Sequence, residues 1–263
     1  MRSSSMFWGG LLILIGFVLV LSNLGVLGNI DIWDLIWPVF LILLGAWFIF
    51  GTLTRRPVQT ERVVIALGEA QSAHLHVQHG AGRLEIRAGA SPGNLVEGDF
   101  GGGLDYSTQK KGDQLAVRMR VPPQFVPIFW YPGHSLDWSF SLAKDFPLTM
   151  DVSSGANEAR LDFTEVNLKK LTVKSGVSST RIDLPAAAGQ TQVNVESGVS
   201  SVHLYVPEGV AARIRSQGGL SSLEVDRSRF PKVAGYYQSS DYEQAQNKVD
   251  IFVQMGIGSV SIK

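Results

Sequence analysis

The residues with the clearest potential for chemistry are three histidines in the segment HLHVQH, at His74, His76 and His79. Imidazole nitrogens bind Zn²⁺ and related metals, and on a strand the first two of these histidines project from the same face. The chain contains no cysteine, and local spacing fixes no acidic partner for the histidines. We therefore treat them as weak candidates for a metal site. The alternative is a solvated strand face, so the sequence predicts no bound metal and no cofactor.

Other patterns that resemble catalytic motifs lack the partners that the chemistry needs. The segment SLAK at 141–144 matches a serine–lysine hydrolase pattern, but the companion motifs SDN and KTG are absent from the chain. No helix is predicted after any of the glycine-rich turns, so they do not match a phosphate-binding loop. The net charge of zero argues against a nucleic-acid-binding protein. The sequence therefore predicts that this protein is not an enzyme.

The elements that position these residues show a period-2 alternation of apolar and polar side chains from residue 62 onward, which predicts strands. LTVKSGVSSTRIDLP, which begins at Leu171, is followed by TQVNVESGVSSVHLYVP and ARIRSQGGLSSLEVD. Each copy has two alternating runs with a glycine between them, and glycine supplies a positive φ or close chain approach at a turn. The predicted turn glycines are Gly82, Gly155, Gly176, Gly198, Gly219 and Gly256.

A repeat of about 20 residues that contains only strands and turns indicates a stack in which each unit buries its apolar face against its neighbours. We therefore expect an all-β repeat domain over 62–263, with a single-stacked, β-solenoid-like architecture. The alternative is an ordinary antiparallel sandwich whose turns are similar by coincidence.

One insertion, at 122–147, departs from the repeat pattern. It is rich in aromatic side chains, and four prolines among its first eleven residues predict a loop and not a strand. An apolar loop must be buried or must meet a partner. We expect the insertion to cap the open end of the β-stack, and the alternative is contact with a partner or a membrane through Phe125, Ile128, Phe129, Trp130 and Tyr131.

The N-terminal part of the chain, residues 1–56, contains two long apolar runs at about 7–27 and 33–53. Each is close to the ~20 residues that a helix needs to cross a bilayer. Tryptophans lie towards the ends of the runs, where interfacial anchors are common. These features predict a membrane α-hairpin of two transmembrane helices, joined to the β-domain by a linker at 57–61.

The charges that flank the two runs predict the orientation of the hairpin. Arg2 precedes the first run, Arg55 and Arg56 follow the second, and the connecting segment has neither lysine nor arginine. The positive-inside rule then places both termini, and with them the β-domain, in the cytoplasm. A cleaved signal peptide is the alternative for the first run, but no A-x-A-like site follows it. We expect a multi-pass protein of the cell membrane with two spans.

Several of these stretches resemble one bacterial family. WGGLLILIGFVLVLSNLG and WPVFLILLG are similar to the LiaI/LiaF-like transmembrane region. FPLTMDVSSGANEARLDF, the SGVSS repeats, VPEGV and the ending YYQSSDYEQAQNKVDIFVQMGIGSVSIK resemble the LiaF C-terminal, or toastrack, domain of cell-wall-active antibiotic response proteins. The resemblance implies a toastrack architecture and a part in sensing or relaying cell-envelope stress, in some members by restraining a two-component system. It supplies no catalytic residues to carry over.

Three functional hypotheses follow. The first is a non-enzymatic, membrane-anchored scaffold or regulator that lies at the lipid bilayer and contacts a membrane protein such as a sensor kinase, or associates with itself. The second is a β-domain at the membrane that binds a ligand, lipid or metal, with or without enzymatic activity, through the histidines or the aromatic insertion. The third is a purely structural, self-assembling membrane protein.

Overall fold

The computed structural model describes most of the C-terminal part of the chain and little of the N-terminal part. The two predicted spans lie almost entirely outside the described residues. Within the part of the chain that is described, no helix is both long and apolar enough to cross a membrane. The described residues are 37, 38, 40, 41, 45, 60–122 and 136–263, without the side chains of 220 and 221.

The alternating pattern after residue 62 forms strands, as the sequence predicts, although the first strand begins two residues earlier, inside the predicted linker. A single sheet of thirteen strands is present among the described residues. The strands are β1 (Thr60–Ala66), β2 (Ser72–Ala88), β3 (Asn94–Gly101), β4 (Asp105–Lys111), β5 (Gln114–Arg120), β6 (Trp138–Leu142), β7 (Leu148–Asp162), β8 (Leu168–Asp183), β9 (Gln190–Tyr205), β10 (Ala211–Val225), β11 (Lys232–Val233), β12 (Tyr236–Gln238) and β13 (Lys248–Ile262).

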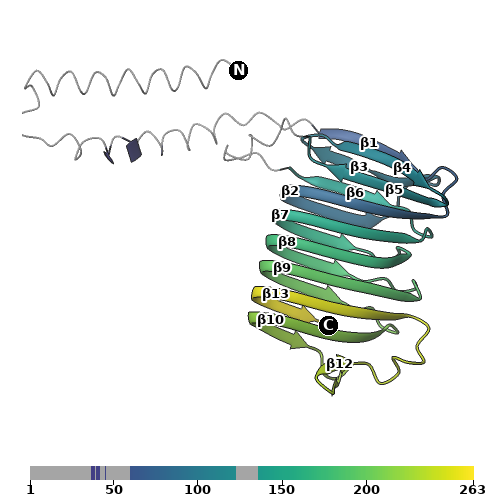
Figure 1. Cartoon of the computed structure of the whole chain (residues 1–263), viewed down its shortest axis with the longest axis vertical. Helices are drawn as coiled ribbons and strands as arrows, with labels where there is room; N and C mark the ends of the chain where they lie inside the picture. The colour runs from purple at the N-terminus through teal and green to yellow at the C-terminus, as the bar shows by residue number, and fades with distance from the viewer. Residues whose placement is uncertain (1–36, 39, 42–44, 46–59, 123–135) are drawn as a thin grey trace, which may run out of the picture. The chain divides into compact units, whose positions relative to one another are not determined.

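The six longest strands run parallel to one another and fold the sheet into two layers. Their order in the sheet is β2, β7, β8, β9, β13 and β10. The first half of β2 pairs with β5, while its second half pairs with β6, so the sheet divides at β2. Figure 1 shows the long strands curving round one edge of the stack to form both layers. The parallel pairing rules out the antiparallel sandwich.

The burial pattern locates the bend in each long strand. In β8, Leu171 and Val173 are buried at odd-numbered positions, whereas Thr180 and Ile182 are buried at even-numbered positions. Successive side chains in a strand point to opposite faces, so a one-residue change of phase turns the other face inward. The change of phase in β8 occurs around Gly176. Both halves of the strand therefore contribute aliphatic side chains to one core between the layers.

A row of glycines crosses the stack where the strands bend. A Cβ atom at Gly176 would lie 2.8 Å from the carbonyl oxygen of Gly155, and one at Gly198 would lie 2.8 Å from that of Gly176. Real Cβ atoms do not approach a backbone oxygen so closely, so only glycine fits. We call this row the glycine ladder; in the order of the sheet it consists of Gly80, Gly155, Gly176, Gly198, Gly256 and Gly219.

Two expectations about these glycines are corrected. They lie inside single long strands, not at turns between two short strands, and a positive φ is not the reason for them, because the ladder glycines have none. Gly82 is not part of the ladder; Gly80 takes that position. Gly82 has a φ of 118° and lies against the backbone of Leu136, where a Cβ would be 2.6 Å from the carbonyl oxygen.

The strand order departs from the order of the repeats. The C-terminal strand β13 lies between β9 and β10, so the second and third glycine repeats of the sequence are not neighbours. The order of the units in the stack therefore differs from their order in the sequence. The physical reason is that parallel strands join through backbone hydrogen bonds, which any repeat with the same glycine spacing can supply.

The aromatic insertion is not a loop throughout. Its C-terminal part forms β6, which lies between β3 and β2. Trp138 and Phe140 of this strand are each only 1 % exposed and pack with Phe100 of β3, with the rings of Trp138 and Phe100 5.3 Å apart. This part of the insertion belongs to the core. The five residues predicted to cap the stack or meet a partner, between 125 and 131, lie outside the described residues.

The ladder predicts that substitutions at two adjacent residues of β9 differ sharply in their effect on the free energy of unfolding. Gly198→Ala would force its methyl group against the oxygen of Gly176 and should lower the free energy of unfolding by about 1–3 kcal/mol, the usual cost of overpacking. Val199→Ala is the control, because Val199 is 48 % exposed. Thermal unfolding of the full chain in detergent, followed by circular dichroism, should show a melting temperature about 2–12 °C lower for Gly198→Ala alone. Equal melting temperatures for the two variants would contradict the ladder.

Candidate functional surfaces

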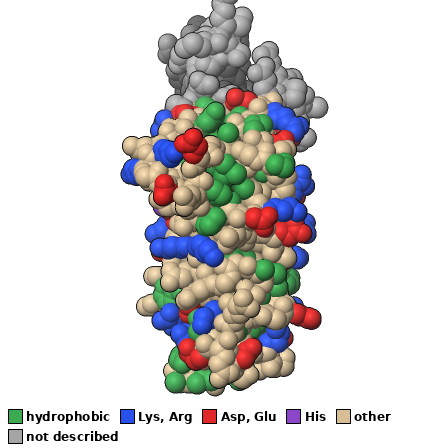
Figure 2. All heavy atoms as spheres, turned by 90° about the vertical axis from the view of Figure 1, so that its right-hand side faces the viewer, with side chains coloured by type: hydrophobic (Ala, Val, Ile, Leu, Met, Phe, Trp, Pro, Cys, Tyr) green, Lys and Arg blue, Asp and Glu red, His purple; other side chains and the backbone are tan. Residues whose placement is uncertain are grey.

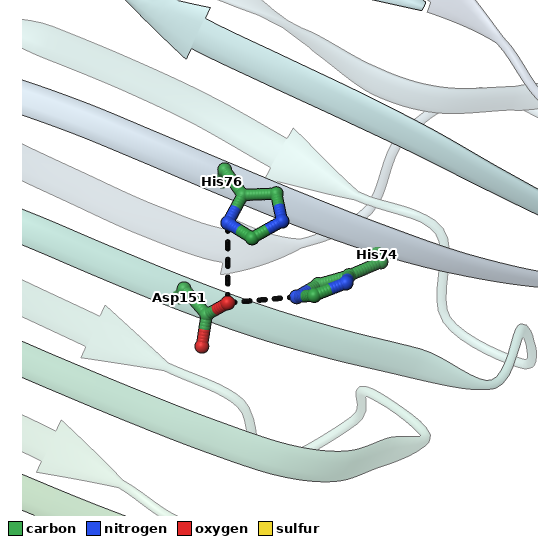
Figure 3. Close-up of side chains that lie close together, drawn as sticks. All are labelled: His74, His76 and Asp151. Carbon is green, nitrogen blue, oxygen red and sulfur yellow. Dashed lines mark hydrogen bonds and ion pairs between the residues drawn. The ribbon is translucent and has the colours of Figure 1, made fainter. Parts of the chain in front are cut away.

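Two of the predicted histidines lie beside a carboxylate on the outer face of β2 and β7. His74 and His76 alternate with the buried Leu75 on β2, and β7 places Asp151 directly opposite His76. The Asp151 Oδ2 atom lies 2.7 Å from Nε2 of His74 and 3.1 Å from Nδ1 of His76. Figure 3 shows both rings directed at this oxygen. The sequence predicted the shared face of the histidines but not their acidic partner.

Hydrogen bonds and burial act against each other at this cluster. Burial works to raise the pKa of the Asp151 carboxyl, but hydrogen bonds from His74 and Thr172 outweigh it and hold that pKa below its usual value. Burial lowers the pKa of His76, and the neighbouring His74 adds to this, against the opposite influence of Asp151. Each of the three side chains keeps about a third of its surface exposed, so the cluster is open to solvent.

The third predicted histidine is not part of this cluster. His79 is 2 % exposed and points into the core, where its ring lies 5.2 Å from that of Trp138. Its Nε2–H donates a hydrogen bond of 2.7 Å to the carbonyl oxygen of Leu136, and Nδ1 has no partner. Burial lowers the pKa of His79, so the ring is held neutral. The group predicted as one metal site therefore divides into an open pair and a buried histidine.

An open groove of about 1000 Å³ follows the glycine ladder across the strands. Glycine backbone and the serines before it line part of the groove, and Ser175 donates a hydrogen bond of 3.0 Å to Ser197 of the next strand. Longer polar side chains line the rest, among them Lys174 and Glu196, which form an ion pair of 2.8 Å. The side chains that line the groove are therefore largely polar and extend across the six long strands.

A row of exposed aliphatic side chains stands immediately after the ladder. Val177, Val199 and Ile257 are 58 %, 48 % and 53 % exposed, and they are in register on the adjacent strands β8, β9 and β13. Neighbouring strands are about 4.8 Å apart, so the three side chains form a continuous strip. We call these three residues the aliphatic row. The sequence did not predict this row, because the glycine in each SGVSS segment indicated a turn and not the interior of a strand.

The opposite side of the stack combines charged and hydrophobic side chains, and the hydrophobic ones gather in the upper half of the view in Figure 2. Figure 2 shows the side that lies to the right in Figure 1, where basic and acidic side chains are interspersed. Pairs such as Lys144 and Glu165, which are 2.6 Å apart, connect charges of opposite sign. A surface of mixed charge does not favour a polyanion such as nucleic acid.

Comparison with protein families identifies the class to which the fold belongs. The family described as the N-terminal domain of toast_rack matches residues 54–205, and the C-terminal domain of LiaF, described as cell wall-active antibiotics response, matches residues 150–262. The LiaI-LiaF-like transmembrane region matches residues 6–49. The chain therefore belongs to the LiaF-like toast-rack family of membrane proteins, and the resemblance noted in the sequence is confirmed.

One solved structure supports the fold. A crystal structure of a candidate cell adhesion protein from Clostridium sporogenes is 21 % identical, with a TM-score of 0.72, and the match covers 79 % of this chain and 99 % of that one. A candidate adhesin from Bacteroides fragilis is 8 % identical over 78 % of this chain and 97 % of that chain, with a TM-score of 0.30. A search of curated proteins finds no significant match. The first similarity shows that the toast-rack fold is shared; it says nothing about function.

The buried histidine predicts a dependence of stability on pH. The pKa of His79 is lowered from 6.5, so below about pH 6.5 the unfolded chain takes up a proton that the folded chain does not, and the free energy of unfolding falls. His79→Gln keeps a donor for Leu136 without titrating in this range. Urea unfolding of the full chain in detergent between about pH 7.5 and 5 should show a weaker decline for this variant than for wild type.

The exposed His203 on β9 provides the matched control, and His203→Gln should follow the wild-type curve. Some decline should remain in His79→Gln, because the pKa of His76 is lowered as well. An unchanged pH dependence in His79→Gln would show that the buried ring does not control acid stability.

Proposed function

We propose that this protein is a membrane-anchored, non-enzymatic scaffold in the bacterial response to cell-wall-active antibiotics, and that it relays envelope stress through protein–protein contacts. The membership of the LiaF-like family and the match to its transmembrane region support a role at the membrane in this response. In the described strands, the open groove and the aliphatic row extend across several repeats, as a contact surface for a protein does. A sensor kinase in the same membrane fits this role as the partner.

The aliphatic row is the observation that carries the proposal. Its three side chains lie on parallel strands that backbone hydrogen bonds hold in register. Burial of a Val or Ile side chain is worth about 1.5–3 kcal/mol, and contiguous apolar surface on a soluble domain commonly marks an interaction site. The polar groove beside it supplies hydrogen-bonding groups for the rim of an interface. The row and the groove together form the proposed docking surface.

We further propose that residues 1–56 form the two-span hairpin and that the strands lie on the cytoplasmic side. Arg2, Arg55 and Arg56 flank the apolar runs, and the segment between the runs carries no positive charge. This orientation would present the aliphatic row to the cytoplasmic domains of a partner. Self-association through the same row is the outcome that would favour the purely structural hypothesis.

The role of the row can be tested in the native host. A strain that lacks the gene should show an altered transcript response to a cell-wall-active antibiotic, measured by RNA sequencing, and wild-type protein should restore it. Val199→Lys combined with Ile257→Lys should fail to restore it at normal protein level, because two buried charges would oppose docking. Val233→Lys is the control, since Val233 is 45 % exposed on β11, outside the row.

The protein that contacts the aliphatic row can be identified by cross-linking. The chain has no cysteine, so Val177→Cys introduces a single thiol on the row. A cross-link in membranes to another protein supports the relay, and a cross-linked dimer of this chain supports self-assembly. Full restoration of the response by the double lysine variant would contradict a role of the row in either.

The orientation predicts which thiols a membrane-impermeant maleimide reaches. Glu208→Cys, exposed between β9 and β10, should be labelled only after cells are lysed, because the strands are expected on the cytoplasmic side. Asn29→Cys, in the segment between the two apolar runs, should be labelled in intact cells. Labelling of the first thiol in intact cells would place the strands outside and overturn the proposed relay to cytoplasmic domains.

A further inference from the structure

We propose that His74, His76 and Asp151 form a binding site for a divalent cation of the zinc class. The site is on the outer face of β2 and β7, whereas the aliphatic row is on β8, β9 and β13. The inference therefore does not depend on the proposed relay function, and each can fail without the other.

The geometry of the donor atoms is close to what such a cation needs. Zn²⁺ binds imidazole nitrogen and carboxylate oxygen at about 2.0–2.2 Å, so ligand atoms around a tetrahedral ion are roughly 3.3 Å apart. Here the Asp151 oxygen lies 2.7 and 3.1 Å from the two ring nitrogens, and the three donor atoms all lie within 4.8 Å of one another. Small rotations of the two rings, each about a third exposed, would bring the three donors round one ion.

The backbone holds the three ligands in place without help from an ion. His76 and Asp151 are directly paired in the β2–β7 ladder, and His74 precedes His76 by two residues on the same face. The two imidazole rings are 4.0 Å apart between centroids. Thr172 of β8 is paired with Asp151 of β7 and donates a hydrogen bond to its carboxylate. A hydrogen bond of this kind, from a residue that does not itself bind the metal, orients a metal ligand.

The chemistry of the donors indicates which cation would bind. Two imidazoles and one carboxylate suit Zn²⁺ and its transition-metal neighbours better than Ca²⁺ or Mg²⁺, which prefer oxygen ligands. Three protein ligands leave a fourth position that faces solvent, open to water or to a group from another molecule.

One neighbouring charge opposes a cation and provides a second test. Arg118 on β5 is paired with His76 and is close enough to lower the pKa of that histidine. Its positive charge would weaken cation binding by Coulomb repulsion through partly screening solvent. Removal of this charge should therefore strengthen binding, an effect that a coincidental group of hydrogen-bonded side chains would not show.

The experiment is a calorimetric titration of Zn²⁺ into the full chain, purified in detergent without a histidine tag and freed of metal with EDTA. Wild type should bind one Zn²⁺ at this site. His74→Ala and Asp151→Asn should each weaken binding at least ~10-fold, whereas Arg118→Gln should tighten it ~2–5-fold. His203→Ala, at an exposed histidine elsewhere on the surface, should bind as wild type does.

A second measurement guards against variants that fail to fold. Zn²⁺ should raise the melting temperature of wild type, because it binds only the folded chain, and should not raise that of His74→Ala or Asp151→Asn. Circular dichroism without metal shows whether each variant is folded, and His76→Gln replaces either variant that is not. No Zn²⁺ binding by wild type, or binding that both substitutions leave unchanged, overturns the proposal.

Discussion

The contact between glycine backbones at the bend of each long strand is the constraint on which the rest of the structure depends. At Gly198, a Cβ would lie 2.8 Å from the carbonyl oxygen of the preceding ladder glycine, and the same holds at Gly176 and Gly155. A larger residue would separate the strands where they must turn together. Because each glycine contacts the next, the ladder fixes the bend at one position in every repeat and aligns the apolar residues on either side of it with one core.

The same alignment decides what the surface presents. In parallel strands held in register, residues at equal distance from the ladder glycine form a row across the sheet. Val177, Val199 and Ile257 each follow a ladder glycine by one residue, which makes the aliphatic row. His76 and Asp151 each precede one by four residues, which brings them together. Both candidate surfaces are therefore consequences of the position of the bend, although neither is needed to form it.

The relation between the ladder glycines and the surface rows also shows which parts of the fold and of the candidate site could be predicted from the sequence. The period-2 pattern was enough to predict the strands, and five of the six predicted glycines are in the ladder. With Gly82 in the ladder position, β2 would shift by two residues and Asp151 would have no histidine directly opposite it, whereas Gly80 places His76 there. The position of β13 between β9 and β10 could not be read from the repeats, because backbone pairing carries no sequence signal. The sequence did not predict the strand β6, because the prolines that precede it indicate a loop.

The division between core and surface bears on the proposed binding role. Between the layers, most positions are occupied by apolar side chains that the core requires, and titratable groups such as His79 are exceptions. Outside, the strands present regular rows whose side chains can change without disturbing the ladder. A catalytic site needs several groups that converge in a closed pocket, whereas rows on an open sheet face extend in two dimensions. These features support the proposed contact with another protein surface, and His74, His76 and Asp151 are where neighbouring strands bring the proposed metal ligands together.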